Sequence, residues 1–377
     1  MPGPSGADNF RSHVRTSLIW AYKLATGLNP KIIDMHGKVI IKTPLGEVPG
    51  IAPLVISASR STDIPAFHAD WFMHRLRQEY CAWVNPFNRD QKTYISFSNC
   101  RVIVFWSKNP EPILRYLDDI SMMGKKFYFQ YTINDYRKEN FEPNVPELDH
   151  RIETFIKIYD KVGKDKIIWR YDPILRTRNL SLDEILDRIY RIGEKISLYT
   201  KKLVLSFADI ANYSRVAYNL NKKDSSAREL NKDERLYFAQ KLSEMNSAWS
   251  NKLVLATCAE IEELSGITHN KCIDDALICK ICPSDKEIAN KYGKLPRQPS
   301  LLGNILTTPK KLKDEGQRDE CGCIPSKDIG AYNTCLHLCT YCYANHTRKA
   351  VENNFEKLSK ASESLCPPPR KRGTCHF

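Results

Sequence analysis

The chain has 377 residues, of which 42% are apolar and 10% aromatic, enough for one large α/β domain with extensions or two ordinary domains. Its formal net charge of +13 favours anionic partners, such as nucleic acids or phosphorylated small molecules. It has no apolar run of transmembrane length, and residues 1–13 lack the apolar core of a signal peptide. We therefore expect no membrane partner and a cytoplasmic location.

The cysteine content points to metal ligation. The chain has 13 cysteines, an odd number, and most of them are clustered near the C-terminus. Without an export signal, such a set is more typical of metal binding than of disulfides.

Residues 1–50 are interpreted as an extension, with a short helix over 16–26 and a hairpin turning at His36 and Gly37. From Pro53, short apolar runs alternate with helical segments. The predicted strands are 54–59, 102–106, 127–133, 167–171, 203–207 and 253–257, and two further strands, 83–85 and 94–98, flank an inserted loop. The predicted helices are 66–78, 110–119, 152–162, 181–196 and 232–248.

This alternation implies parallel strands that are buried on both faces. Two architectures fit, a barrel and a doubly wound sheet, and no GxGxxG or GxxxxGK[ST] string marks a nucleotide site. Polar residues recur just after the strands, as in barrels. We therefore expect an α/β fold with a partial or complete (β/α) barrel over 51–265. A cysteine-rich iron–sulfur segment (266–350), which is polar and loop-rich over 268–320, and a mobile basic tail (351–377) follow it.

The strand-end residues are candidates for catalysis or binding. They are Arg60, Asp63, Lys108, Asn109, Arg170, Asp172, Asp209 and Glu260. Arginine and lysine at a barrel mouth can hold a carboxylate or phosphate, and the carboxylates can bind a ribose or an ammonium group. The alternative is an internal salt-bridge network that ties the strand ends together.

Three cysteines in one loop, Cys335, Cys339 and Cys342, have three residues and then two residues between them. A [4Fe–4S] cluster normally takes four thiolates, so three would leave one iron open for a ligand. The aromatic rings of Tyr341 and Tyr343 can cover such a cluster and pack on a flat ligand. The alternative is a Cys₃His zinc site completed by His337 or His346.

Four more cysteines, Cys258, Cys272, Cys321 and Cys323, form a possible second site for a cluster or a zinc ion. The alternative is that some of them are ordinary buried cysteines. Gln317 and Arg318 lie just before the last two cysteines, where they can order the loop or contact a cofactor.

The string CLHLCTYCYA (335–344) resembles the cluster loop of radical S-adenosylmethionine (radical SAM) enzymes. In that family the amine and carboxylate of S-adenosylmethionine bind the open iron, and reductive cleavage gives a 5′-deoxyadenosyl radical. The resemblance implies a [4Fe–4S] cluster, S-adenosylmethionine and an electron donor such as ferredoxin or flavodoxin. From their positions beside the cysteines or at a strand end, Tyr341, Tyr343, Asn109, Gln317 and Arg318 are predicted to contact this cofactor.

The chain departs from that family in two respects. Radical SAM enzymes usually carry the cluster loop after the first barrel strand, whereas here it follows the last. The Gly-Gly-Glu string that binds the cofactor amine in many members is absent. A closed barrel would place the first and last strands side by side, so that the loop could still reach the site.

The motifs SASRSTDIPAF, VNPFN, VFWSKNP, IWRYDPI and SKDIGAYNTC occur in order and resemble domain-of-unknown-function family 1848. That family is uncharacterised and carries C-terminal cysteines similar to the radical SAM loop. FWSKNP and WRYDP also distantly resemble spore photoproduct lyase relatives, which repair DNA by radical chemistry. The sequence predicts a radical SAM-like enzyme with an unknown substrate. The alternative is a metal-stabilised nucleic-acid-binding or redox-sensing protein without catalysis.

Overall fold

The computed structural model describes residues 37–260, 262–293, 313–314 and 316–366. Its centre is a parallel sheet of eight strands in the order β11-β10-β9-β8-β7-β6-β3-β12. The strands are β3 (Val55–Ala58), β6 (Val102–Ser107), β7 (Lys126–Thr132), β8 (Ile167–Ile174), β9 (Lys202–Phe207), β10 (Val254–Thr257), β11 (Thr268–His269) and β12 (Lys327–Asp328). The predicted α/β class and the six predicted apolar strands are confirmed.

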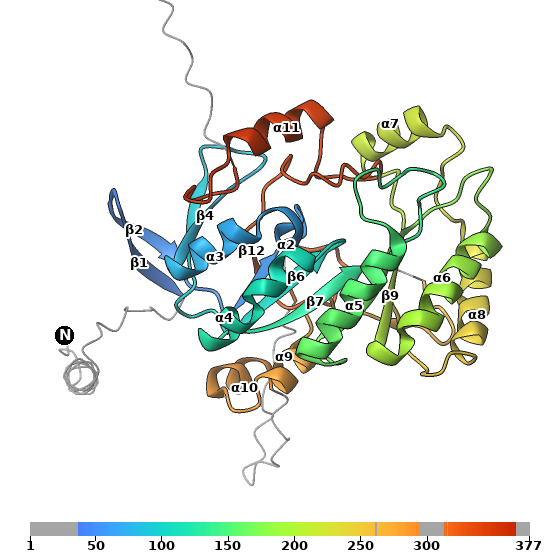
Figure 1. Ribbon diagram of the computed structural model, residues 1–377, viewed down its shortest axis with the longest axis horizontal. Helices are drawn as coiled ribbons and strands as arrows, with labels where there is room; N and C mark the ends of the chain where they lie inside the picture. Colours follow the sequence, from blue (N-terminus) through green and yellow to red (C-terminus); the bar gives the residue numbers. More distant parts are fainter. Residues whose placement is uncertain (1–36, 261, 294–312, 315, 367–377) are drawn as a thin grey trace, which may run out of the picture.

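Helices cover one face of this sheet, and Figure 1 shows α4, α5 and α6 along one side of the strands. They are α2 (Ile64–Phe67), α3 (Ala69–Arg77), α4 (Leu117–Met122), α5 (Leu148–Val162), α6 (Leu182–Ile196) and α8 (Lys232–Asn246). Helix α7 (Ser214–Lys223) lies beyond the ends of the strands (Figure 1). Alternate strand residues such as Ile103, Phe129 and Trp169 pack against the covering helices in a buried core. Because side chains alternate along a strand, the intervening residues face the opposite side.

That opposite face is also covered, by a segment that the sequence predicted to be loop-rich. Val104, Tyr128 and Ile168 pack there against α9 (Asp275–Ile281) and α10 (Lys286–Tyr292). The prediction of loops over residues 275–292 is wrong, because two short helices are stabilised there by burial against the sheet.

Two other helix predictions need correction. The predicted helix over 66–78 is broken at His68, whose ring is held by a 2.9 Å hydrogen bond to the carbonyl oxygen of Thr334. The segment after Pro110 is a 3₁₀ helix (Glu111–Tyr116) that continues into α4. The helix α7 was not predicted.

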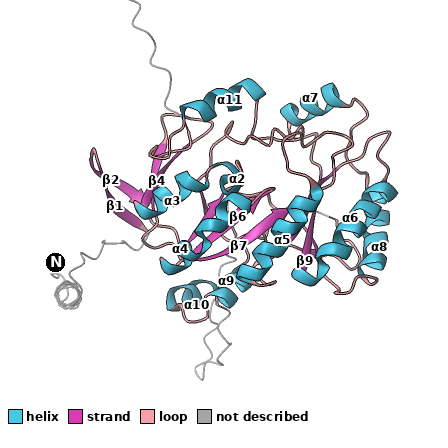
Figure 2. Ribbon diagram, viewed as in Figure 1, coloured by secondary structure: helices cyan, strands magenta, loops and turns pink. Residues whose placement is uncertain are grey.

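A smaller four-stranded sheet, in the order β1-β2-β5-β4, lies beside the main sheet (Figure 2). It contains β1 (Lys38–Thr43), β2 (Gly46–Ile51), β4 (Tyr80–Val84) and β5 (Lys92–Ser96). The hairpin joining β1 to β2 turns at Pro44 and Leu45. The predicted turn at His36 and Gly37 depends on residues before Gly37, which lie outside the described residues. The predicted helix over 16–26 lies outside the described residues.

The main sheet is open, because its edge strands β11 and β12 are not paired with each other. The prediction of a complete barrel is therefore wrong. The last strand in the chain, β12, nevertheless lies beside β3, the first strand of the sheet, with Lys327 opposite Ile56 and Asp328 opposite Ser57.

The segment after the cysteine loop is folded onto the domain. It begins with α11 (Arg348–Lys357), and Leu365 is buried. The Glu363 carbonyl oxygen accepts a 2.7 Å hydrogen bond from the Ala82 amide, which attaches the segment to β4. The prediction of a mobile tail over 351–377 is therefore wrong for residues 351–366, which are folded against the domain. Throughout the described residues, every helix is too short or too polar to cross a bilayer.

Candidate functional site

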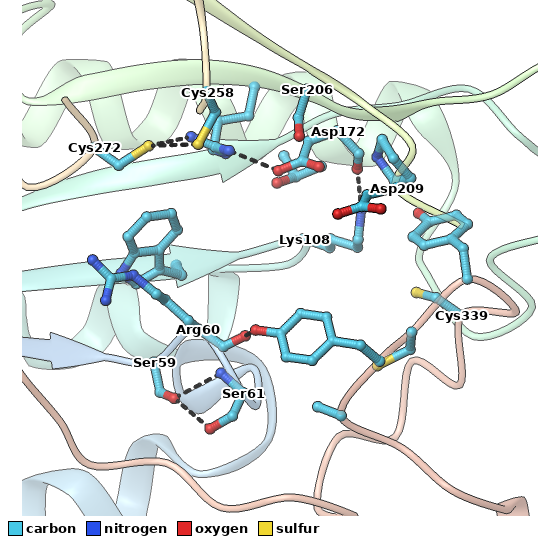
Figure 3. Close-up of a pocket in the computed structure, with 18 of the residues that line it drawn as sticks. Ser59, Arg60, Ser61, Lys108, Asp172, Ser206, Asp209, Cys258, Cys272 and Cys339 are labelled. Atoms are coloured by element: carbon cyan, nitrogen blue, oxygen red, sulfur yellow. Dashed lines mark hydrogen bonds and ion pairs between the residues drawn. The ribbon is translucent and has the colours of Figure 1, made fainter. Parts of the chain in front are cut away.

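The carboxyl ends of the central strands open into a cavity of about 480 Å³. Most of the residues predicted for a site line it. They are Arg60, Asp63, Lys108, Arg170, Asp172, Asp209, Gln317, Arg318, Tyr341 and Tyr343, with Cys335, Cys339, Cys342, Cys258, Cys272, Cys321 and Cys323. In Figure 3, Cys258 and Cys272 lie together on one side of the cavity, with Cys339 on another side. Residues from distant parts of the sequence therefore meet at one place.

The cysteine loop begins where β12 ends, beside the end of β3. The carboxylate of Asp328 accepts hydrogen bonds from the Ser57 hydroxyl (3.1 Å), the Ser59 hydroxyl (2.6 Å) and the Arg60 amide (2.8 Å). Two residues later the chain passes so close that a Cβ atom on Gly330 would lie 2.0 Å from the Ser59 oxygen. Asp328 and Gly330 thus join the loop to β3.

Asp63 fixes the middle of the loop through His337. Its carboxylate accepts hydrogen bonds from the His337 ring (2.8 Å), the Ser107 hydroxyl (2.7 Å) and the Lys108 amide (2.7 Å). It also caps α2, because it accepts from the Ala66 amide at 3.0 Å. The other ring nitrogen of His337 lies 3.3 Å from the Asn144 carbonyl oxygen, so both nitrogens are occupied. This pairing does not support His337 as a zinc ligand.

A second network surrounds Lys108. Its ammonium group donates to the Glu142 carboxylate (2.9 Å) and to the Asp172 carbonyl oxygen (3.3 Å). Glu142 also accepts from the Asn134 side chain at 3.0 Å and from the Tyr341 hydroxyl. Burial works against the charged form of Lys108, but Glu142 and Cys339 outweigh it and raise the pKa of Lys108. The network therefore places a positive charge near the cysteine loop.

Acid should lower the stability of the native chain more than it lowers the stability of a Glu142→Gln variant. Burial alone would raise the pKa of Glu142, but Lys108, Arg151 and the Tyr341 hydroxyl lower it from 4.5 to about 2. A carboxyl with a lowered folded-state pKa stabilises the fold above its unfolded pKa, and this contribution is lost as the pH falls towards 2. Between pH 7 and pH 3, urea unfolding should show an extra loss of roughly 2 kcal/mol in the native chain.

The control for this experiment is Glu153→Gln, which changes an exposed glutamate on α5. This variant should keep the full acid sensitivity of the native chain. Equal acid sensitivity in the native chain and Glu142→Gln would contradict the assignment of this effect to Glu142.

Arg170 lies on the face of the sheet opposite α4, α5 and α6, and it is 3% exposed. It donates to the Asp172 carboxylate at 2.7 Å and to the Cys272 sulfur at 3.0 Å. The guanidinium groups of Arg170 and Arg60 each lie 5.3 Å from the ring centroid of Trp106. The Arg60 Nη2 and Trp106 Nε1 atoms are buried without a hydrogen-bond partner. Two residues that line the cavity therefore each have a buried donor without a hydrogen-bond partner.

Tyr341 and Tyr343 occupy different positions around the last cysteine of the loop. Tyr341 points into the network of Lys108 and Glu142. Tyr343 is 40% exposed, and its hydroxyl donates to the Arg60 carbonyl oxygen at 2.9 Å. Its ring neighbours Tyr213 and Tyr332, so the cavity has an aromatic rim.

Two predicted site residues do not line the cavity. Asn109 follows β6, and its side-chain oxygen is buried without a partner. Glu260 accepts from the Phe207 amide (3.3 Å) and from Arg235 (3.2 Å), and burial raises its pKa to about 7. In this structure Glu260 joins two strand ends and pairs with Arg235, and its catalytic role stays a prediction.

The three loop thiols are partly buried, and burial raises the pKa of Cys335, Cys339 and Cys342. In the possible second site of Cys258, Cys272, Cys321 and Cys323, a hydrogen bond with the Cys323 thiol lowers the pKa of Cys321 to about 7. Within the described ranges, no group of three or more histidine, cysteine or carboxylate side chains already has the arrangement that holds a metal ion.

Sequence reasoning missed Glu142, Asn134 and Asp328, and weighed His337 only as a zinc ligand. Glu142 and Asn134 lie in the long connection between β7 and α5 and contact each other, and their other partners, Lys108 and Asp172, are remote in sequence. A buried acid is seldom stable unless it is paired, but the sequence gives no sign that Glu142 is buried.

Comparison with known proteins gives a family but no characterised relative. A family model described as Domain of unknown function (DUF1848) matches residues 55–344. The chain belongs to this family. The match begins at β3 and ends in the cysteine loop, so it spans the main sheet and the cavity. No curated protein and no solved structure matches the chain.

Proposed function

We propose that the chain is a radical SAM-like enzyme with a [4Fe–4S] cluster on Cys335, Cys339 and Cys342. The observation that carries this proposal is the position of β12. Its pairing with β3 makes it the strand that precedes β3 in the sheet order, and the cysteine loop follows it directly. Radical SAM enzymes carry their loop after the first barrel strand. The pairing of β12 with β3 supports a position of the loop like that in radical SAM enzymes, although the chain order differs.

The fold supports the same proposal. From β12 through β3 and β6 to β11, each strand pairs with the next without a reversal of order. This succession is typical of a barrel and not of a doubly wound sheet, whose strand order reverses at a switch point. We interpret the open sheet as a partial barrel.

The donor set suits an iron–sulfur cluster. Three thiols from one loop line the same cavity, and each thiolate of a cubic cluster binds a different iron, so the sulfurs need not converge on one point. The bound cluster would supply one electron for reductive cleavage of S-adenosylmethionine, with ferredoxin or flavodoxin as the external donor.

The chain's own residues would orient the loop and bind the ligands. Asp63 holds His337 between the first two cysteines, and Lys108 places a positive charge near Cys339. The unpaired donors of Arg60 and Trp106 would bind a carboxylate or phosphate of the cofactor or the substrate. The surplus positive charge of the chain is compatible with a nucleic acid or a phosphorylated small molecule as substrate.

The test is anaerobic purification with iron and sulfide analysis, followed by EPR of the reduced protein with and without S-adenosylmethionine. We expect a [4Fe–4S] signal that changes when S-adenosylmethionine is added, together with formation of 5′-deoxyadenosine. A cluster signal that ignores the cofactor would indicate electron transfer or redox sensing. Absence of iron after anaerobic reconstitution would refute the enzyme proposal.

A further inference from the structure

The four cysteines Cys258, Cys272, Cys321 and Cys323, here called the second cysteine group, lie together on the side of the sheet opposite the large helices. They come from three segments, namely the end of β10, the turn after β11 and the stretch before β12. The Cys258 and Cys272 sulfurs are 3.5 Å apart. The Cys323 thiol lies within hydrogen-bond reach of both Cys272 and Cys321. Four thiols thus form a continuous series of contacts.

This spacing favours a single ion over a cluster. Thiolates bound tetrahedrally at about 2.3 Å from one zinc ion lie about 3.8 Å from one another. Thiolates that bind separate irons of a cubic cluster lie farther apart, because the inorganic core lies between them. The 3.5 Å separation of Cys258 and Cys272 is close to the first case.

The surroundings provide donors for thiolate sulfur. The Cys272 sulfur accepts from Arg170 at 3.0 Å and from the Asn270 side chain at 3.1 Å, and the Cys323 sulfur accepts from the Ile273 amide at 3.3 Å. Such outer contacts orient metal ligands and stabilise their charge.

The charges also balance in part. Four thiolates around a divalent ion carry a net charge of −2, which is costly to bury without compensation. Arg170 contacts Cys272 directly while it also pairs with Asp172. The Arg60 guanidinium lies against the same Trp106 ring as that of Arg170. These two guanidinium groups would offset part of the charge of the occupied site.

The backbone of Cys272 is already held in place. Its carbonyl oxygen accepts from the Tyr128 hydroxyl at 2.7 Å and from the Gln130 side chain at 2.9 Å. Among the described residues the thiols do not already converge on one point, so binding requires rotation of cysteine side chains onto a common centre. The single residue between Cys321 and Cys323 is a shorter spacing than the two to four residues common in zinc knuckles.

We propose that Cys258, Cys272, Cys321 and Cys323 bind one zinc ion, which joins the ends of β10 and β11 to the segment that leads into β12. The site has four protein ligands and no open position, so its role is structural. It would hold in place the strand that carries the cysteine loop. This inference does not depend on a cluster at Cys335, Cys339 and Cys342.

The test is metal analysis of the full chain, purified anaerobically without chelator, in the native form and in Cys323→Ser, Cys339→Ser and Cys279→Ser variants. We expect about one zinc per chain in the native protein, in Cys339→Ser and in the control Cys279→Ser, whose cysteine on α9 does not line the cavity. Zinc should be lost from Cys323→Ser. Iron should be kept in Cys323→Ser and lost from Cys339→Ser. This difference separates the proposed zinc site from the proposed cluster.

Because Cys323→Ser can fail to fold, cobalt substitution of the native chain provides a second measurement. We expect the visible absorption and thiolate-to-cobalt charge-transfer bands of a tetrahedral all-sulfur site, and their loss on addition of zinc. Absence of these bands, full zinc retention in Cys323→Ser, an iron–sulfur cluster that survives in Cys339→Ser, or a Cys258–Cys272 disulfide in the native protein would each overturn the proposal.

Discussion

Replacement of Cys339 with serine should remove the iron–sulfur chromophore and stop 5′-deoxyadenosine formation. Cys339 lies between the other two cysteines of its loop, and its sulfur lines the cavity near Lys108. With only two thiolates left in the loop, the cluster would lose a ligand from one of its irons. We expect iron to fall from about four per chain to below about one, and cofactor cleavage to fall by at least about 100-fold.

The matched control is Cys279→Ser, since Cys279 lies on α9 and does not line the cavity. This variant should keep the iron, the spectrum and the cleavage activity of the native chain. Circular dichroism of Cys339→Ser would show that the fold is retained. An unchanged spectrum in Cys339→Ser would exclude this cysteine as a cluster ligand.

Replacement of Asp63 with alanine should cost about 3–5 kcal/mol of folding free energy in the metal-free chain. The change removes the carboxylate that pairs with the buried His337 ring, and it leaves the Ser107 hydroxyl and the Lys108 amide without their acceptor. A buried polar group without a hydrogen-bond partner destabilises the fold, because nothing offsets the free energy lost when it was removed from water. Urea unfolding followed by tryptophan fluorescence measures the loss.

Two variants sharpen this experiment. Asp63→Asn keeps one acceptor oxygen for the Ala66 amide and the Ser107 hydroxyl, so its loss should be smaller, about 1–3 kcal/mol. Asp187→Ala removes an exposed carboxylate that pairs with Arg191 on α6, and it should change stability by less than about 0.5 kcal/mol. If Asp63→Ala were as stable as Asp187→Ala, Asp63 would not anchor the cysteine loop.

The pairing of Asp63 also bears on the two interpretations of the strand-end residues, a functional site and a salt-bridge network. Asp63, Arg170 and Lys108 are all paired, as a structural network requires, yet all three line the cavity. Arg60 differs from them, because one of its guanidinium nitrogens is buried without a partner. The network therefore supports the walls, while Arg60 and Trp106 are the stronger candidates for direct contact with a ligand.

Local sequence signals determined six of the eight strands of the main sheet and most of the residues that line the cavity. Runs such as residues 102–106 are apolar over their whole length and are buried on both faces, so the sequence alone shows a central parallel strand. Parallel strands end at a common edge, and for that reason polar residues such as Lys108 and Arg170 could be assigned to one site. The spacing of Cys335, Cys339 and Cys342 is likewise a local property.

Only the tertiary structure decided which distant segments meet. The two-residue strand β12 has no sequence signal of its own, yet its pairing with β3 places the cysteine loop at the cavity. The helices α9 and α10 form where the sequence is polar, since burial against the sheet overrides weak local preference. Glu142 and His337 take their roles from partners about 34 and 274 positions away, Lys108 and Asp63. Such contacts depend on how the chain returns to the sheet, which no local window of sequence contains.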